Sequence, residues 1–176
     1  MNIIKIFCAA FLMIACNWAS AVANQNALIE QEARAFFDRY LATYNNRFGH
    51  PDRSDQFRQQ LGELVQIPLL QAPPMSAPLV PDSLDTFTRN FEGFVTMLEG
   101  KNVVKLEWQQ VEIQVLTPNK VLANNIGFGF TADGEVAYET ISLYLLYRNG
   151  DNWKIAMFSP YQMDNAIHLE RNPSTR

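Results

Sequence analysis

The spacing of the apolar residues changes once along this 176-residue chain, at Gly100, and that change limits the folds open to it. Before Gly100 the apolar side chains recur every three or four positions, as they do on one side of an α-helix. After it they alternate with polar residues, as in strands that bury one face. Helices followed by strands predict an α+β domain, in which the helices pack on one face of an antiparallel sheet.

The first hundred residues predict three helices. Apolar side chains follow the helical spacing over residues 27–48, over 55–65, and from about 82 or 83 to 100. Gly49 ends the first helix, and Ser54 is in place to cap the second. Five prolines follow between positions 68 and 81. Because proline lacks an N–H donor, that segment is expected to be a loop or a strand at the edge of a sheet.

Four strands are expected after the third helix, joined as an antiparallel meander. They cover residues 104–115, 121–131, 135–147 and 153–159. In the first strand the apolar positions change from even to odd at Gln109–Gln110. Since side chains alternate between the two faces of a strand, this change predicts a β-bulge. Pro118–Asn119 is expected to form the turn that follows.

Asp133–Gly134 is typical of a two-residue turn between the second and third strands. Such a turn would pair Phe130 with Ala137, and Phe128 with Glu139. One face of this hairpin is then mostly apolar and carries Ile126, Phe128, Phe130, Ala137, Ile141, Leu143 and Leu145, with Glu139 among them. The other face is amphipathic and carries Asn125, Gly127, Gly129, Tyr138, Thr140, Ser142 and Tyr144. The apolar face is the better core by hydrophobicity. The amphipathic face would line a pocket or form a dimer surface, and which face is concave stays open.

Residues 1–23 have the features of a secretory signal peptide. A lysine precedes a short apolar stretch, and Ala21-Val22-Ala23 matches an A-x-A cleavage site. The stretch is too short for a transmembrane helix. We predict cleavage near Ala23, one domain over residues 24–176, and a periplasmic or secreted protein. The alternative is a lipid anchor at Cys16, because Met13-Ile14-Ala15-Cys16 resembles a bacterial lipoprotein cleavage site.

Few residues of this chain suit a cofactor or a metal ion. Both cysteines, Cys8 and Cys16, lie in the predicted leader, so cleavage would leave no thiol. The two histidines, His50 and His168, are not spaced as metal ligands. The sequence has no phosphate loop, dinucleotide fingerprint or G-x-S-x-G element. The net charge of −4 argues against a nucleic-acid partner. We expect no cofactor, no metal, no nucleic acid and no membrane span.

The order of elements resembles that of the nuclear-transport-factor-2-like superfamily, including its SnoaL-like and ketosteroid-isomerase-like groups. The resemblance rests on the end of the first helix, Asp38-Arg39-Tyr40-Leu41-Ala42-Thr43-Tyr44-Asn45, and on the closing hairpin over 144–158 with Gly150-Asp151-Asn152-Trp153-Lys154-Ile155. It implies a cystatin-like cone, in which three helices pack in the concave face of a curved antiparallel sheet around a small-molecule pocket. It also implies a homodimer, since many members dimerise through the sheet.

The isomerase branch of that superfamily is the sharpest comparison for catalysis. Arg39-Tyr40 resembles its helix-one Arg-Tyr pair, whose tyrosine donates a hydrogen bond to a developing oxyanion. The branch has its base before a proline, where this chain has Ile67 before Pro68. It has a second aspartate on the penultimate strand, where residues 141–145 include no carboxylate. Without a base, proton abstraction loses its first step. Steroid isomerisation is therefore not expected, and Tyr40 is expected to be a core tyrosine with a satisfied hydroxyl.

Glu139 is the titratable residue that stands out on the strands. If apolar side chains surround it, its pKa would be raised, as in many general acids and bases. If it lies where the sheet meets solvent, or pairs with a basic side chain, it has no such role. Charged residues are rarely buried without a partner, which favours the second interpretation.

The leading functional hypothesis is an exported domain that binds a small apolar or amphipathic molecule and has no clear catalytic set. Its expected pocket residues are mostly aromatic: Tyr40, Tyr44, Phe91, Phe94, Trp108, Phe128, Tyr144 and Met157. One alternative is a dehydratase, isomerase or cyclase that uses Glu139 with the helix-one tyrosine Tyr40 or Tyr44. The other alternative is a non-catalytic structural or adaptor homodimer, held through an exposed sheet face.

Overall fold

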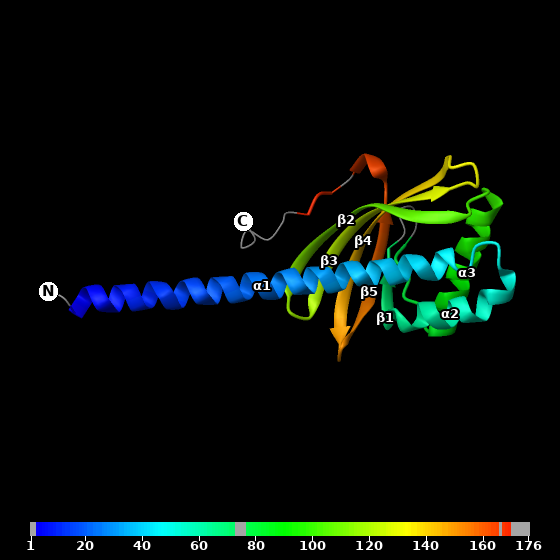
Figure 1. The fold of residues 1–176 in the computed structure, drawn as a ribbon. Helices are drawn as coiled ribbons and strands as arrows, with labels where there is room; N and C mark the ends of the chain where they lie inside the picture. Colours follow the sequence, from blue (N-terminus) through cyan, green and yellow to red (C-terminus); the bar gives the residue numbers. More distant parts are fainter. Residues whose placement is uncertain (1–2, 73–76, 166, 170–176) are drawn as a thin grey trace.

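A computed structural model describes residues 3–72, 77–165 and 167–169 of the chain. The elements follow the order α1 (Ile3–Asn45), α2 (Ser54–Glu63), β1 (Val65–Gln71), α3 (Leu84–Gly100), β2 (Lys105–Thr117), β3 (Lys120–Phe130), β4 (Val136–Asn149) and β5 (Asn152–Tyr161). Single 3-10 turns cover Pro51–Arg53 and Met163–Asn165. The helices pack against one face of a curved sheet, so the predicted α+β class is confirmed (Figure 1).

Helix α1 is longer than the sequence pattern predicted, since it begins at Ile3 and not at Ala27. Its second half crosses the curve of the sheet, whereas its first half extends away from the rest of the molecule (Figure 1). The seated half buries one stripe at helical spacing, which consists of Ile29, Ala33, Phe36, Phe37, Tyr40 and Tyr44. Within the described residues no helix is long and apolar enough to cross a membrane. Cleavage near Ala23 stays a prediction, and residues 1–2 of the expected leader and 170–176 of the expected domain lie outside the described residues.

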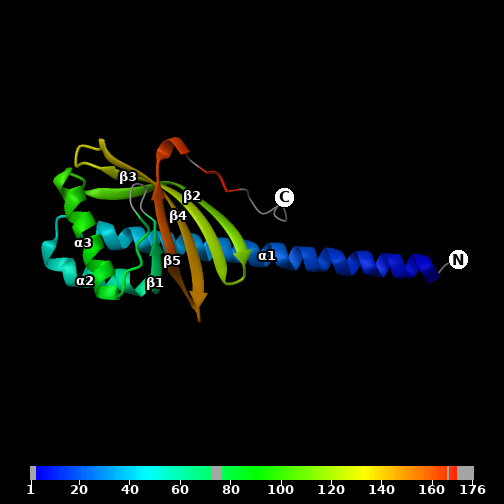
Figure 2. The same cartoon turned by 180° about the vertical axis from the view of Figure 1, so that it is seen from behind.

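The sheet has five strands in the order β1-β5-β4-β3-β2, one more than the predicted meander. Strand β1 pairs in parallel with β5, while the other neighbours are antiparallel. Pro68 lies within β1, at the edge of the sheet. An edge strand has no neighbouring strand on its outer side, so proline is tolerated there although it lacks an N–H donor. For residues 68–71 the edge-strand interpretation is therefore confirmed, whereas residues 73–76 of this segment lie outside the described residues. Figure 2 shows β1 beside helices α2 and α3.

The bulge predicted in β2 is present, because the pairing with β3 shifts between Trp108 and Gln110. The predicted β3–β4 turn is wrong by one residue. Thr131 N–H donates to Glu135 C=O at 2.9 Å, which leaves three residues in the loop, with Gly134 at φ +84°. A three-residue loop of this kind carries its glycine in the left-handed region and is followed by a bulge. Phe130 therefore pairs with Val136 and not with Ala137.

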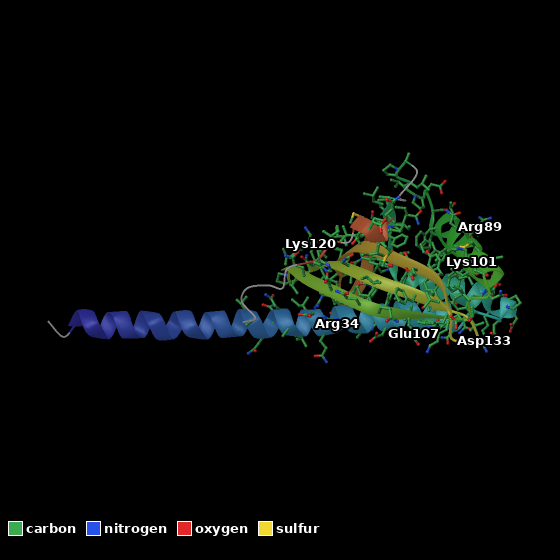
Figure 3. The ribbon with its side chains drawn as sticks, turned by 90° about the horizontal axis from the view of Figure 1, so that it is seen from above. Arg34, Arg89, Lys101, Glu107, Lys120 and Asp133 are labelled. Atoms are coloured by element: carbon green, nitrogen blue, oxygen red, sulfur yellow. The ribbon has the colours of Figure 1, made fainter. Side chains whose placement is uncertain are left out.

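One residue further along, the bulge restores the predicted register of the β3–β4 hairpin. Phe128 does pair with Glu139, and Gly127 with Thr140. The amphipathic face of this hairpin is the concave one, because Gly127, Ser142 and Tyr144 face the helices together with Trp108 of β2. Hydrophobicity alone favoured the other face. It failed here because the aromatic side chains of α1 and α3 supply the apolar contacts of the core. Figure 3 labels Lys120 at the start of β3 and Asp133 in the loop between β3 and β4.

Hydrogen bonds join α1 to β2, the other edge strand. Arg34 donates to Val111 C=O at 2.8 Å. Asn45 binds both polar groups of one residue, since its amide donates to Leu106 C=O at 3.0 Å and accepts from Leu106 N–H at 2.8 Å. In the opposite direction, the Trp108 indole N–H donates to Phe37 C=O of α1 at 3.1 Å. These bonds fix the depth and the rotation of α1 in the sheet.

Arg47, which is only 4% exposed, joins the end of α1 to α3. Its Nε donates to Glu92 Oε1 at 2.7 Å, and its Nη1 lies 3.2 Å from Glu99 Oε1. Ser54 Oγ also donates to Glu92 at 2.9 Å, at the start of α2. One buried guanidinium thus holds all three helices together. Since removal of one partner leaves a poorly solvated charge behind, such pairs are costly to break.

We expect Arg47→Met to lower the free energy of unfolding by about 3 kcal/mol, because Glu92 and Glu99 would lose their counter-ion. Urea denaturation followed by circular dichroism measures this change. Arg89→Met is the matched control, since Arg89 pairs with Asp85 on the exposed surface of α3 and should change stability by less than about 0.5 kcal/mol. Equal effects of the two substitutions would contradict the role given to Arg47.

Candidate functional site

A cavity of about 220 Å³ lies between α1, α3 and the concave face of the sheet. Its wall is mainly aromatic, with hydroxyl and carboxamide groups between the rings. The lining residues are Tyr40, Leu41, Tyr44, Gln71, Asn90, Phe91, Phe94, Leu106, Glu107, Trp108, Gly127, Tyr138, Thr140, Ser142, Tyr144, Phe158 and Pro160. Small residues at the centre of β3 and β4 leave this space open, because Gly127, Thr140 and Ser142 face a helix without filling the gap.

Most of the predicted pocket residues meet at this cavity. Phe128 and Met157 do not line it. Phe128 pairs with Glu107 and Glu139 and lies on the convex face, since it neighbours the inward-facing Gly127 along β3. Met157 likewise neighbours the inward-facing Phe158 on β5. Each of these predictions is wrong by one strand position, which exchanges the two faces of a strand.

Sequence reasoning missed seven of the lining residues: Leu41, Gln71, Asn90, Leu106, Glu107, Phe158 and Pro160. Phe158 and Pro160 follow the alternation of β5 and could have been found from its period of two. Gln71 could not, because its place depends on the parallel pairing of β1 with β5, which no local pattern indicates.

Hydroxyl groups follow one another in a row along the cavity wall. The row consists of Tyr44, Tyr40, Tyr144, Ser142, Thr140 and Tyr138. The hydroxyls of Tyr40 and Tyr44 lie 3.0 Å apart. Tyr144 packs against Tyr40, with ring centroids 6.0 Å apart. The Oγ atoms of Ser142 and Thr140 are 3.5 Å apart. Tyr138, Thr140, Ser142 and Tyr144 occupy alternate positions of β4, so their side chains share one face of the strand. The row therefore runs from the buried end of α1 to half-buried Tyr138.

The three inner tyrosines stay neutral. Burial raises the pKa of Tyr40, Tyr44 and Tyr144 well above the ordinary phenol value, and the neighbouring phenols add to the rise for Tyr40 and Tyr144. Burial also raises the pKa of Tyr138. At neutral pH the row therefore consists of O–H donors that carry no charge.

Glu107 is the charged residue among the described lining residues. Its side chain is 43% exposed and is paired with Lys105. Glu139, the predicted acid or base, is exposed and does not line the cavity. It contributes instead to an open hollow with Asp164 on the outer surface. The interpretation of Glu139 as a residue where the sheet meets solvent is thus supported. Among the described residues no group of His, Cys, Asp and Glu could hold a metal ion.

Trp108 closes one side of the cavity and depends on a glycine opposite. Its indole lies parallel to the Tyr40 ring at 6.5 Å, and its N–H is bonded to Phe37 C=O. A Cβ atom at Gly127 would lie 2.9 Å from Trp108 Cζ3. Since such an approach is too short for two carbon atoms, Gly127 is what allows the indole to rest on the sheet.

Comparisons with known proteins agree with this architecture. A family model described as NTF2-like protein (DUF6841) matches residues 31–163. The chain belongs to this NTF2-like family. The resemblance noted in the sequence is therefore confirmed. A comparison with curated proteins finds no match.

Solved structures share the fold of this NTF2-like protein at low identity. A domain of unknown function with a cystatin-like fold from Nostoc punctiforme is 14% identical, with a TM-score of 0.54 over 75% of each chain. An NTF2-like protein of unknown function from Shewanella oneidensis is 11% identical, with a TM-score of 0.56 over 76% of this chain and 98% of that one. A Catenulispora acidiphila protein in complex with S-DNPA is 14% identical, with a TM-score of 0.55 over 77% and 93%. These identities show the fold alone.

We expect Gly127→Ala to displace the Trp108 indole and to lower the free energy of unfolding by about 1–3 kcal/mol, as overpacking does in other cores. A shift of the tryptophan fluorescence maximum, together with urea denaturation, measures both effects. Gly93→Ala on the exposed side of α3 is the control, because its new Cβ would meet no atom within 4 Å. It should raise stability by about 0.5–1 kcal/mol, since alanine favours a helix. If Gly127→Ala changed neither the fluorescence maximum nor the free energy of unfolding, the contact between Gly127 and Trp108 would be refuted.

Stability should fall in alkaline solution because of the buried tyrosines. The folded protein holds their protons more tightly than the unfolded chain, in which a tyrosine has a pKa of about 10. The stabilisation is therefore complete below about pH 10 and is lost as the pH rises further. Urea denaturation at pH 8 to 11 measures the slope.

The double variant Tyr40→Phe/Tyr44→Phe should reduce this alkaline slope. Tyr147→Phe is its control, because Tyr147 lies exposed on β4. An unchanged slope in the double variant would disprove the explanation.

Proposed function

We propose that this protein is an exported, non-catalytic binding protein that holds a small, neutral, aromatic or amphipathic molecule in the cavity between α1, α3 and the sheet. The hydroxyl row on an otherwise aromatic wall carries this proposal. Export, to the periplasm or outside the cell, rests on the predicted leader over residues 1–23 and on no structural observation.

The wall favours neutral ligands that have a hydrogen-bonding oxygen. Aromatic rings supply apolar contact area, and a few placed polar groups supply orientation. An open row of six hydroxyls has six protons and five neighbouring pairs, so at least one O–H remains to donate to a ligand. A buried charge would be poorly compensated, since none of the inner lining groups is charged.

The size of the cavity, and a complex formed by a protein of the same fold, are consistent with a small ligand. A volume of about 220 Å³ suits a molecule of roughly one or two rings. The Catenulispora acidiphila protein of the same fold is a complex with S-DNPA. That complex supports the view that this fold can bind a small molecule, and it says nothing of which molecule this chain binds.

The enzyme alternative finds less support in the geometry. It needed Glu139 beside Tyr40 or Tyr44, and Glu139 lies outside the cavity. Ile67 stands before Pro68 where the isomerase branch has its base, and its side chain carries no proton. The third hypothesis, a homodimer held through its sheet, concerns the convex face and is compatible with a ligand in the cavity.

Binding of 2-naphthol and of 2-naphthoate tests the proposed function. At pH 7 the naphthol is neutral and should bind, because the hydroxyl row accepts and donates hydrogen bonds. The naphthoate should bind at least tenfold more weakly, because its charge would lack a partner. Quenching of tryptophan fluorescence reports on occupancy through Trp108, and isothermal titration calorimetry gives the affinity.

A variant with a larger side chain in the cavity wall controls this experiment. Thr140→Phe should abolish binding of the naphthol, since Thr140 lines the cavity. Thr117→Phe, at the exposed end of β2, should leave it unchanged. If the wild-type protein binds neither compound, or if both variants bind the naphthol as the wild type does, the proposed function is wrong.

A further inference from the structure

Gln71 places a carboxamide group at the edge of the cavity. The residue ends β1 and is only 8% exposed. Its backbone is fixed by two hydrogen bonds with Leu79, of 2.9 and 2.7 Å. Its side chain lines both the cavity and a surface hollow formed with Leu79, Val80 and Thr86. That side chain makes no hydrogen bond with any residue in the described part of the chain.

The Gln71 carboxamide faces these two hollows, since its polar atoms are not among the fully buried unpaired side-chain atoms of the described residues. Native proteins rarely retain a mostly buried carboxamide unless the protein, water or a ligand satisfies it. Because Gln71 faces a cavity, a molecule in that cavity can supply the missing partner. This observation is independent of the hydroxyl row, which lies on other strands.

The pairing of the strands sets the distance between Gln71 and the hydroxyl row. Gln71 pairs with Phe158 of β5, and Phe158 pairs with Tyr144 of β4. All three side chains line the cavity. Neighbouring strands lie about 4.8 Å apart, so the backbones of Gln71 and Tyr144 are roughly 10 Å apart. Along this wall a carboxamide and a phenol hydroxyl are separated by one phenyl ring.

We infer that the ligand of this cavity is a flat ring with a neutral hydrogen-bonding group at each of two opposite ends. One end accepts from the hydroxyl row near Tyr144, the ring lies against Phe158, and the other end pairs with the Gln71 carboxamide. A carboxamide both donates and accepts, so the group opposite it does the same, as an amide does. This inference rests on the proposed function and narrows its ligand class.

Four simple compounds separate the contributions of the two ends: toluene, phenol, benzamide and 4-hydroxybenzamide. By isothermal titration calorimetry, 4-hydroxybenzamide should bind about tenfold more tightly than phenol, because it adds one well-placed hydrogen-bonded group. Gln71→Met keeps the length of the side chain but removes its polar atoms. It should abolish the tenfold gain and leave phenol binding unchanged. Tyr144→Phe should instead weaken the binding of phenol.

Gln66→Met is the matched control for Gln71→Met. Gln66 lies on the same strand, does not line the cavity, and donates to Ile67 C=O at 3.0 Å. It should leave the affinity of all four compounds unchanged. Thermal unfolding without ligand adds a second measurement. Gln71→Met should melt at the wild-type temperature or above it, since the Gln71 amide makes no hydrogen bond within the described part of the chain that the variant would lose.

The outcomes distinguish this inference from the proposed function. If phenol binds but the amide adds nothing, or if Gln71→Met loses phenol and 4-hydroxybenzamide equally, the inference is wrong and the proposed function stands. A marked fall in the melting temperature of Gln71→Met would also overturn it, because the amide would then have a partner within the fold. If none of the four compounds binds, the proposed function fails together with the inference.

Discussion

The attachment of α1 to the edge strand β2 determines the rest of this structure. An edge strand presents unpaired N–H and C=O groups. In this protein Arg34, Asn45 and the backbone C=O of Phe37 form hydrogen bonds with that strand. These contacts fix the rotation of the helix. Tyr40 and Tyr44, which lie between Arg34 and Asn45 in the sequence, therefore face the cavity. If α1 were rotated by one residue, the phenols would leave the cavity and the helix would lose its hold on β2.

The cavity is a consequence of unequal side-chain sizes on the two surfaces that meet there. The helices contribute large aromatic residues such as Phe91 and Phe94, whereas the centre of the sheet contributes Gly127, Thr140 and Ser142. The rings contact one another edge to face, as Tyr44 and Phe94 do at 6.3 Å, and so form a rigid wall instead of collapsing onto the sheet. The hydroxyl groups of that wall keep their protons because burial raises the pKa of the tyrosines, so the row is polar without being charged.

Local patterns predicted the elements well, because each element depends on residues close together in the sequence. Ser83 caps α3 with its side chain, and the bulge follows from two adjacent glutamines in β2. The patterns failed where the result depends on distant pairing. The assignment of the core face needed the aromatic residues of α1 and α3, and the place of Gln71 needed a parallel partner about ninety positions away. Phe128 and Met157 show the same limit, since a period of two identifies alternation but not which side faces the helices.

This fold serves many chemistries, so a function has to be argued from the site and not from the family. The position that holds the base in the isomerase branch is occupied here by Ile67, before Pro68. The other candidate acid or base, Glu139, lies outside the cavity. The cavity wall consists mainly of neutral donors and acceptors, and its charged member, Glu107, is paired with Lys105. Neutral groups at fixed positions distinguish one neutral ring from another by the positions of its polar groups, because each mismatch leaves a buried polar atom unpaired. This arrangement is what supports the proposed binding of a neutral ligand.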